Sequence, residues 1–303
     1  MDKIALVTIT YNSADVLRPF LDCVWKQAHS NLILYVIDNA SSDLTLSILK
    51  NEKDNRLQVV KNSKNLGVAV ANNQGIRKAI LDGCDQLLII NNDVEFESSL
   101  IEKLIKIQIK DKSSLVSPKI MYYDNPNQIW YAGSWFIKEK GYVPLHRGMK
   151  ELDEGQYNEI INVEYAPTCC LLVKKEVFQD IGLMDEKYFV YFDDTDFLYR
   201  VLRDGRHKIL YYPHVEFYHK VGSLTKSFEK SEKKVCRGDF FLQQNTKNHI
   251  YFLKKIGGVF SYAFIVWLFF KNNIRFIVNP QIRKNFATWW LINKSYFEGL
   301  SLK

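Results

Sequence analysis

The stretch that most constrains the fold is residues 86–94, Gln-Leu-Leu-Ile-Ile-Asn-Asn-Asp-Val. Its apolar part is short and uninterrupted, which is typical of a strand buried on both faces in a parallel sheet. Asp93 then follows the carboxyl end of this strand, where open α/β sheets bind their ligands. Taken alone, Asn91, Asn92 and Asp93 are more typical of a turn or a helix cap, so a functional interpretation depends on the rest of the chain.

Strands and helices alternate along the first part of the chain. Three further apolar runs are each followed by apolar residues at helical spacing: residues 4–9, 32–37 and 57–60. The last of these helical segments, residues 68–81, is rich in small residues that allow close packing. Such alternation predicts right-handed crossovers and a mostly parallel α/β sheet. Asp38 ends the second run, so Asp38 and Asp93 are expected to face one crevice.

The pattern changes in the second half of the chain. From about residue 115 the apolar runs are shorter and richer in aromatic residues, which predicts a mixed, partly antiparallel region. A strand is expected at residues 166–173 and a short helix at 175–181. A further helix is expected to open with three acids, Asp193, Asp194 and Asp196.

Composition sets limits on the class of protein. A chain of 303 residues with 47% hydrophobic residues can form one large domain and an appendage. The five cysteines are odd in number and lack the paired spacing of zinc sites, which favours reduced thiols. The opening residues lead directly into a strand and do not resemble a signal sequence, so a cytoplasmic location is expected.

The net charge of +7 is concentrated in the tail. Residues 226–303 contain 14 basic and 4 acidic residues, a balance of +10. Within them, residues 256–270 form an apolar run that is too short to span a bilayer. This run is either a helix buried against the rest of the protein or an interfacial helix that contacts an anionic membrane. Nucleic acid is a poorer fit, because the charge lies beside apolar residues and not on a solvated basic face.

Several motifs follow one another in a characteristic order. They are Thr10-Tyr11-Asn12, Asp38 to Asp43, Asn65-Leu66-Gly67, Asn72 to Gly75, Asn91-Asn92-Asp93, Gly182 to Asp196, and His219 to Ser223. Their order and spacing resemble those of the family 2 inverting glycosyltransferases of the GT-A fold, especially the bacterial rhamnosyltransferase-like branch, over residues 3 to 225. The resemblance implies a GT-A catalytic domain at residues 1–225, followed by a helical extension at 226–303.

The resemblance also implies roles for individual residues. A nucleotide-sugar donor would be bound by Thr10, Tyr11, Asn12, Asp38, Asn65, Gly67, Asn73 and Asn92. Asp93 and His219 would hold a divalent cation, Mn²⁺ or Mg²⁺, and an imidazole ligand favours Mn²⁺. His214 is the alternative histidine for this role. Three features depart from the family pattern: Asn91 replaces the first acid of the metal motif, Asp193 replaces a glutamate, and Cys169 and Cys170 replace small residues.

Inversion at an anomeric carbon needs one base, which takes the proton of the attacking hydroxyl. Asp194 is the candidate base and Asp193 is the fallback. Both also fit a simpler interpretation, because acids at the start of a helix complement its dipole. The two interpretations are compatible, since a helix N-terminus favours the ionised carboxylate that a base requires.

The resemblance therefore implies an inverting glycosyltransferase of cell-surface polysaccharide synthesis. Its donor would be dTDP-rhamnose or a UDP-hexose, and its acceptor a saccharide or a lipid-linked molecule. Peripheral contact with an anionic membrane at its inner face and a possible homo-oligomer are also expected, and nucleic acid is not. The alternatives are a nucleotidyltransferase, which normally has a glycine-rich basic loop after the first strand, and a non-catalytic sugar- or nucleic-acid-binding protein.

Overall fold

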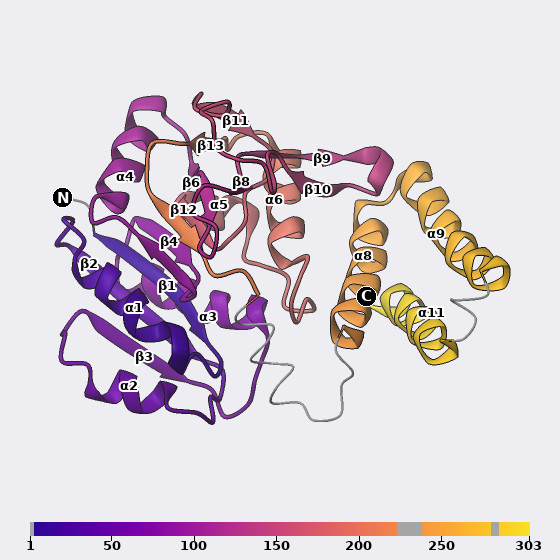
Figure 1. Ribbon diagram of the computed structural model, residues 1–303, viewed down its shortest axis with the longest axis horizontal. Coiled ribbons are helices and arrows are strands. Elements are labelled where there is room, and N and C mark those ends of the chain that lie inside the picture. The colour runs from indigo at the N-terminus through magenta and orange to yellow at the C-terminus, as the bar shows by residue number, and fades with distance from the viewer. Residues whose placement is uncertain (1–2, 223–237, 280–284) are drawn as a thin grey trace.

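The computed structural model describes residues 3–222, 238–279 and 285–303. Ser223 of the last motif, Cys236 and the predicted boundary between residues 225 and 226 lie outside the described residues. The main sheet has eight strands in the order β11-β13-β6-β12-β4-β1-β2-β3 (Figure 1). Four neighbouring strands of this sheet are parallel to one another: β1 (Ile4–Thr10), β2 (Leu32–Asp38), β3 (Leu57–Lys61) and β4 (Gln86–Ile90). The predicted parallel sheet is thus confirmed.

The strand β4 lies near the middle of the main sheet, and all of its residues are buried. As predicted, the strand ends before the two asparagines: β4 ends at Ile90, and a bend at Asn91–Asp93 leads the chain into β5 (Val94–Phe96). On the other side of β4, β12 (Cys170–Lys174) pairs antiparallel with it and with β6 (Leu115–Pro118). The sheet is completed by β13 (Ile209–Tyr212) and β11 (Ile161–Val163), so the mixed second half is also as expected.

Two smaller sheets contain the remaining strands. One has four strands in the order β5-β14-β7-β8, with β14 at Phe217–His219, β7 at Ile120–Tyr122 and β8 at Ile129–Tyr131. The other is a hairpin of β9 (Ser134–Ile137) and β10 (Val143–His146), joined through a short 3-10 helix at Lys138–Lys140. The pairing of β14 with β5 brings a segment from late in the chain beside the turn that follows β4.

Six helices accompany the strands of the first 222 residues. They are α1 (Ala14–Trp25), α2 (Thr45–Asn51), α3 (Val68–Leu81), α4 (Leu100–Asp111), α5 (Lys175–Ile181) and α6 (Asp193–Asp204). The small residues of α3 do allow close packing, as expected. A β-carbon added at Gly75 would overlap with the side chain of Val7 on β1, so the helix approaches the sheet at this point as closely as glycine permits.

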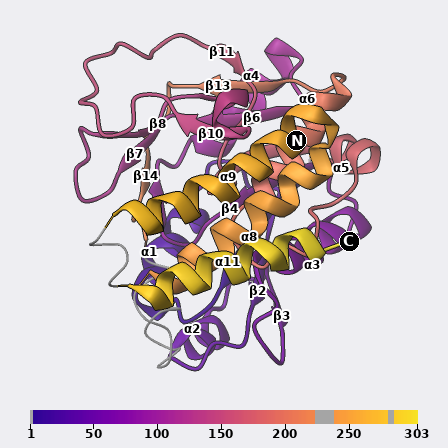
Figure 2. The ribbon, with the colours of Figure 1, turned by 90° about the vertical axis from the view of Figure 1, so that its right-hand side faces the viewer.

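The carboxy-terminal part is helical, with α8 (Asp239–Ile256), α9 (Gly258–Val278) and α11 (Phe286–Ser301) (Figure 2). Tyr251 and Phe252 of α8 pack with Tyr188, Phe192 and Tyr199 around α6. The extension is therefore joined to the sheet-containing part through an apolar cluster. Among the described residues, no helix combines the length and apolar character required to cross a membrane.

Candidate functional site

A cavity of about 470 Å³ lies at the carboxyl ends of β1 and β4. The turn after β4, the start of α3, the segment before β12, the segment before α6 and the end of β14 all contribute to its wall. This is the edge of an α/β sheet at which ligands bind. The cavity is the natural candidate for the site, because most of the motif-bearing segments meet at it.

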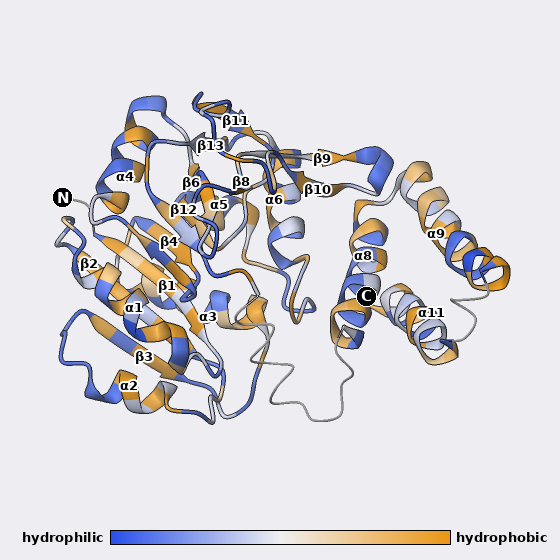
Figure 3. Cartoon of the chain, in the orientation of Figure 1, coloured by the Kyte–Doolittle hydropathy of each residue, from blue (hydrophilic) through white to orange (hydrophobic). Residues whose placement is uncertain are grey.

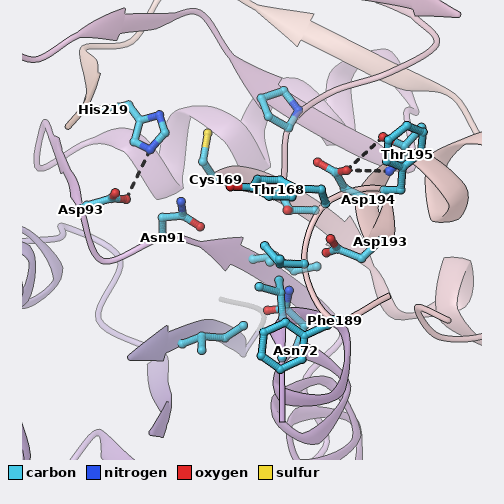
Figure 4. A pocket seen from close by; sticks show the side chains of 18 of the residues that line it. Asn72, Asn91, Asp93, Thr168, Cys169, Phe189, Asp193, Asp194, Thr195 and His219 are labelled. Atoms are coloured by element: carbon cyan, nitrogen blue, oxygen red, sulfur yellow. Dashed lines mark hydrogen bonds and ion pairs between the residues drawn. The ribbon is translucent and has the colours of Figure 1, made fainter. Parts of the chain in front are cut away.

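Asp93 and His219 lie together on one side of the cavity (Figure 4). The register of β14 against β5 sets His219 opposite Val94, next to Asp93, and the backbone N–H of Lys220 donates to the carbonyl of Asp93 over 2.8 Å. His219 Nε2 is 3.3 Å from Asp93 Oδ1, and both side chains are buried. His214 instead is exposed after the end of β13, so His219 is the histidine that geometry pairs with Asp93.

The chemistry of this pair fits a divalent cation. Beyond the 3.3 Å approach of His219 Nε2, Asp93 Oδ1 has no hydrogen-bond partner among the described residues, and neither has His219 Nδ1. Both atoms are buried, which is costly unless another group uses them. One carboxylate and one imidazole are few ligands, but a cation bound to a diphosphate takes most of its oxygens from phosphate and water. The described residues hold no group of three or more acidic, histidine or cysteine ligands, so the pair would act only together with such a substrate.

Asp193 and Asp194 lie on the opposite side of the cavity, with Thr168 and Cys169 between them and the Asp93–His219 pair (Figure 4). Asp194 Oδ2 accepts a hydrogen bond from the Tyr165 hydroxyl at 2.7 Å. Asp194 Oδ1 accepts one from the backbone N–H of Thr195 at 2.6 Å. The carboxylate is therefore held at both oxygens.

The two carboxyl groups differ in their electrostatics. Burial raises the pKa of Asp194, but the hydrogen bonds from Tyr165, Thr195 and the backbone of Thr168 oppose this rise. Burial, together with the charge of neighbouring Asp194, raises the pKa of Asp193 well above its usual range. The surroundings of Asp194 thus favour its ionised form more than those of Asp193 do, which makes Asp194 the better candidate for a base.

Asn65 and Gly67 line the cavity at the start of α3. Asn65 Oδ1 accepts from the backbone N–H of Gly67 at 3.0 Å, and Val68 N–H donates to the Phe189 carbonyl at 2.6 Å. Gly67 has φ of +86°, and a β-carbon there would lie 2.5 Å from the Phe189 carbonyl oxygen. Glycine is required because the segment before α6 lies directly against this turn.

Five of the predicted donor-binding residues are not part of the cavity wall that the described residues form: Thr10, Asn12, Asp38, Asn73 and Asn92. Asp38 is completely buried and accepts hydrogen bonds from the hydroxyls of Thr10 and Ser41 at 2.8 and 2.6 Å. Asn12 Oδ1 accepts from the backbone N–H of Ser42 at 2.8 Å. These groups connect the ends of β1 and β2, so Asp38 and Asp93 do not face one crevice.

Asn73 and Asn92 also bond within the protein. Asn73 donates to the Met184 carbonyl at 2.9 Å and to the Glu186 carboxylate at 3.0 Å. Asn92 donates to the Ile9 carbonyl at 2.6 Å. Their sequence neighbours Asn72 and Asn91 line the cavity instead, as does the predicted residue Tyr11.

Sequence reasoning missed several parts of the cavity wall. Tyr165 and Thr168 precede β12, and Trp130 and His146 belong to the small sheets. Trp130 contacts the His219 ring edge-on, with ring centroids 4.7 Å apart. Phe240 and Asn245 of α8 also line the cavity, so the extension forms part of the site. These contacts join distant segments, and the sequence holds no local signal for them.

Comparisons with known proteins agree with this geometry. Residues 5–182 match the family model described as glycosyl transferase family 2. The low-salt glycan biosynthesis hexosyltransferase Agl10 of Haloferax volcanii is 22% identical over 208 residues, which are 68% of this chain and 63% of that protein. The match thus spans just under two thirds of that relative. The dTDP-rhamnosyl transferase RfbF of Shigella flexneri is 24% identical over 224 residues, 73% of this chain and 70% of that protein.

The fold is shared with a solved structure. The mannosyltransferase PcManGT from Pyrobaculum calidifontis, in complex with GDP-Man and Mn²⁺, superposes with a TM-score of 0.57 at 14% identity, over 99% of this chain and 87% of that chain. The predicted GT-A fold with helices at its carboxy-terminal end is confirmed. Because the family model covers more than half of the sequence, the chain belongs to glycosyl transferase family 2.

Proposed function

We propose that the protein is an inverting glycosyltransferase that moves a sugar from a nucleotide-diphosphate donor to the hydroxyl of a saccharide or lipid-linked acceptor. The observation that carries the proposal is the cavity with two sides. One side holds the buried pair Asp93 and His219, and the other holds Asp194 with a hydrogen bond at each carboxylate oxygen. Family membership supports the same reaction class.

On the donor side, the negative charge of the leaving diphosphate must be neutralised. Asp93 and His219 would hold Mn²⁺ or Mg²⁺, which when bound supplies positive charge to the departing phosphates. The Pyrobaculum mannosyltransferase, which shares the fold, forms a complex with GDP-Man and Mn²⁺, and this supports the assignment. Tyr11, Asn65 and Gly67 would contact the nucleotide, because they line the cavity near the end of β1.

On the acceptor side, Asp194 would act as base. The acceptor oxygen forms a bond to the anomeric carbon as the bond to the diphosphate oxygen breaks, and the hydroxyl proton passes to the Asp194 carboxylate. A carboxylate has about four acceptor positions, so its bonds to Tyr165 and Thr195 leave room for the acceptor hydroxyl. One base suffices because inversion takes a single displacement.

We further propose dTDP-rhamnose or a UDP-hexose as donor and cell-surface polysaccharide synthesis as the pathway, at the cytoplasmic face of the cell membrane. The relatives named as a glycan hexosyltransferase and a dTDP-rhamnosyl transferase support this choice. These proposals for donor, pathway and location are compatible with a homo-oligomer.

A thermal-shift screen of UDP, dTDP and GDP sugars, with Mn²⁺ and with a chelator, tests the donor side. We expect the sugars of one nucleobase to stabilise the protein selectively and only with Mn²⁺, since a ligand that binds only the folded state stabilises it. Asp93→Ala should remove the Mn²⁺-dependent part of the thermal shift, and Asn91→Ala should reduce that part less. Asp124→Ala, an exposed acid outside the cavity wall, is the matched control. Equal nucleotide affinity with Mn²⁺ and with the chelator would contradict the cation assignment.

A further inference from the structure

The helix α9 is apolar on two faces. Ser261 and Ile265 are buried on the face toward α8 and α11. On the other side an exposed stripe recurs at spacings of seven, four, four and three residues. Its side chains are between 53% and 89% exposed: Val259, Val266, Phe270, Ile274 and Ile277. A helix that is apolar all round is normally buried all round.

A second exposed stripe lies on α11. Phe286, Trp290 and Phe297 share one face of this helix by their spacing and are 60%, 53% and 56% exposed. The two helices lie side by side: Trp289 stacks on Phe276 with ring centroids 4.7 Å apart. We call the two stripes together the α9–α11 surface.

The α9–α11 surface differs from the rest of the described chain. Just over half of the exposed large apolar side chains among the described residues lie on these two helices, and elsewhere such residues are scattered. Scattered apolar residues need no explanation, but a concentrated set indicates an interaction site. The two helices lie at the end of the molecule farthest from β1, β2 and β3 (Figures 1 and 3).

Charge identifies the class of partner. The sequence of α9 contains no acidic residue but has Lys271 and Arg275, both exposed. Lys271 Nζ lies 4.4 Å from the centre of the Trp267 ring, and Lys294 Nζ lies 5.3 Å from that of Trp290. Exposed tryptophan beside lysine, next to an apolar stripe, is the composition of a helix that lies in the interface of an anionic membrane. A second copy of the chain would bring basic residues against basic residues.

We propose that the α9–α11 surface docks on an anionic lipid bilayer, with its apolar side chains in the interface and Lys271, Arg275 and Lys294 at the headgroups. This inference stands on the surface alone and does not require the proposed transfer reaction.

The helix α8 contacts both the cavity and α9, so it connects the docking surface with the proposed reaction site. Phe240 and Asn245 of α8 line the cavity, whereas Ile250 and Leu253 of the same helix pack against Ile265 of α9. The helix α8, about 10 Å across, lies between the sheet-containing part and the docking helices α9 and α11 (Figure 1). If the proposed function is correct, the acceptor is lipid-linked and is reached at the membrane.

Co-sedimentation of the full chain with phosphatidylcholine vesicles, with and without phosphatidylglycerol, tests the docking. Binding is expected to the anionic vesicles at low salt and to weaken with added salt. Phe270→Ser and Ile274→Ser should each lower the partition coefficient about tenfold, because each removes an apolar side chain from the interface. Lys271→Gln should lower it about fivefold. Leu81→Ser is the matched control, since Leu81 is 84% exposed at the end of α3 and lies outside the surface.

Two outcomes would overturn the docking. One is a full chain that stays in the supernatant with anionic vesicles at low salt. The other is binding that Phe270→Ser and Ile274→Ser leave at the level of Leu81→Ser. Sedimentation equilibrium distinguishes the rival partner: a dimer that Phe270→Ser dissociates, without vesicle binding, would assign the surface to a second copy. Loss of sugar transfer with vesicle binding intact would contradict the proposed function and leave the docking in place.

Discussion

The hydroxyl of Tyr165 donates a hydrogen bond to Oδ2 of Asp194 over 2.7 Å, from the segment before β12 to the first turn of α6. Burial and the nearby charge of Asp194 raise the pKa of Tyr165 well above its usual range, so the phenol keeps the proton that it donates. A donor held at this position favours the ionised carboxylate and fixes its orientation. Tyr165 is therefore a positioning residue for the proposed base.

Tyr165→Phe tests this relationship through the pH dependence of transfer. Loss of a hydrogen bond to a charged group costs about 1.5–3 kcal/mol, or about one to two pH units in the pKa of Asp194. The pKa rises because the ionised form loses its donor. Activity should therefore fall at neutral pH, recover as the pH rises, and leave the KM for the donor unchanged.

The control for Tyr165→Phe is Tyr157→Phe, which removes a phenol that bonds to Glu151 on the surface and should leave the pH profile in place. A Tyr165→Phe enzyme that loses activity equally at every pH would show a structural role only.

Asp194→Asn should reduce turnover by about a hundredfold or more, because an amide cannot take the acceptor proton. Nucleotide affinity measured by calorimetry should stay nearly unchanged, since the Asp93–His219 side of the cavity is intact. Asp193→Asn is the comparison, and its effect should be smaller because the surroundings of Asp193 favour the ionised form less than those of Asp194 do. If Asp193→Asn were inactive while Asp194→Asn kept most of its activity, the assignment of the base would be wrong.

The parts of the fold that the sequence predicts well are those that depend on local pattern. The strands β1, β2 and β4 are nearly continuous apolar runs, and the small residues of α3 indicate its close packing on β1 before any contact is known. Asp93 could be placed because it follows such a strand directly. This reasoning works because the side-chain pattern of a buried strand is set by the strand itself.

Individual side chains in the motifs were harder to place. Asn72 and Asn73 are consecutive on α3, where neighbouring side chains point about 100° apart, so only one of them reaches the cavity. The same one-residue difference separates Asn91 from Asn92 in the turn after β4. Tyr165 and α8 depend on contacts between distant segments, and the pairing of His219 with Asp93 depends on the register of β14 against β5. Register across such a separation is a property of the folded chain.

Gly67→Ala tests how closely the segment before α6 lies against the start of α3. A positive φ costs alanine about 1–2 kcal/mol at any site, and the overlap with the Phe189 carbonyl adds to this at Gly67. Gly83→Ala is the matched control, because Gly83 has a similar φ of +77° and open space around its β-carbon position. Thermal unfolding should show the larger loss for Gly67→Ala, together with weaker nucleotide binding. Equal losses for the two variants would mean that the Phe189 segment moves away without cost.

The ion pairs of Lys255 join α8 to the segment before α6 and to α6 itself. Lys255 Nζ lies 2.7 Å from Asp185 Oδ2 and 2.6 Å from Asp196 Oδ1, and Asp196 is almost completely buried. Lys255→Ala should lower the free energy of unfolding by about 1–3 kcal/mol, less than for a fully buried pair because Arg200 still pairs with Asp196. Lys294→Ala is the control, since Lys294 is exposed and lies 3.8 Å from the partly exposed Glu298.

The pH dependence of unfolding gives a second test of the Lys255 ion pairs. Burial acts to raise the pKa of Asp185, but its hydrogen bonds, led by the one from Lys255, outweigh burial and lower it below the usual value of 3.8. A carboxylate with a lowered folded-state pKa adds stability above its unfolded pKa and loses it as the pH falls through the folded value. Wild-type protein should therefore lose stability below about pH 4, and Lys255→Ala should lose less over the same range. Parallel stability curves for the two proteins would show that Lys255 does not hold Asp185 ionised.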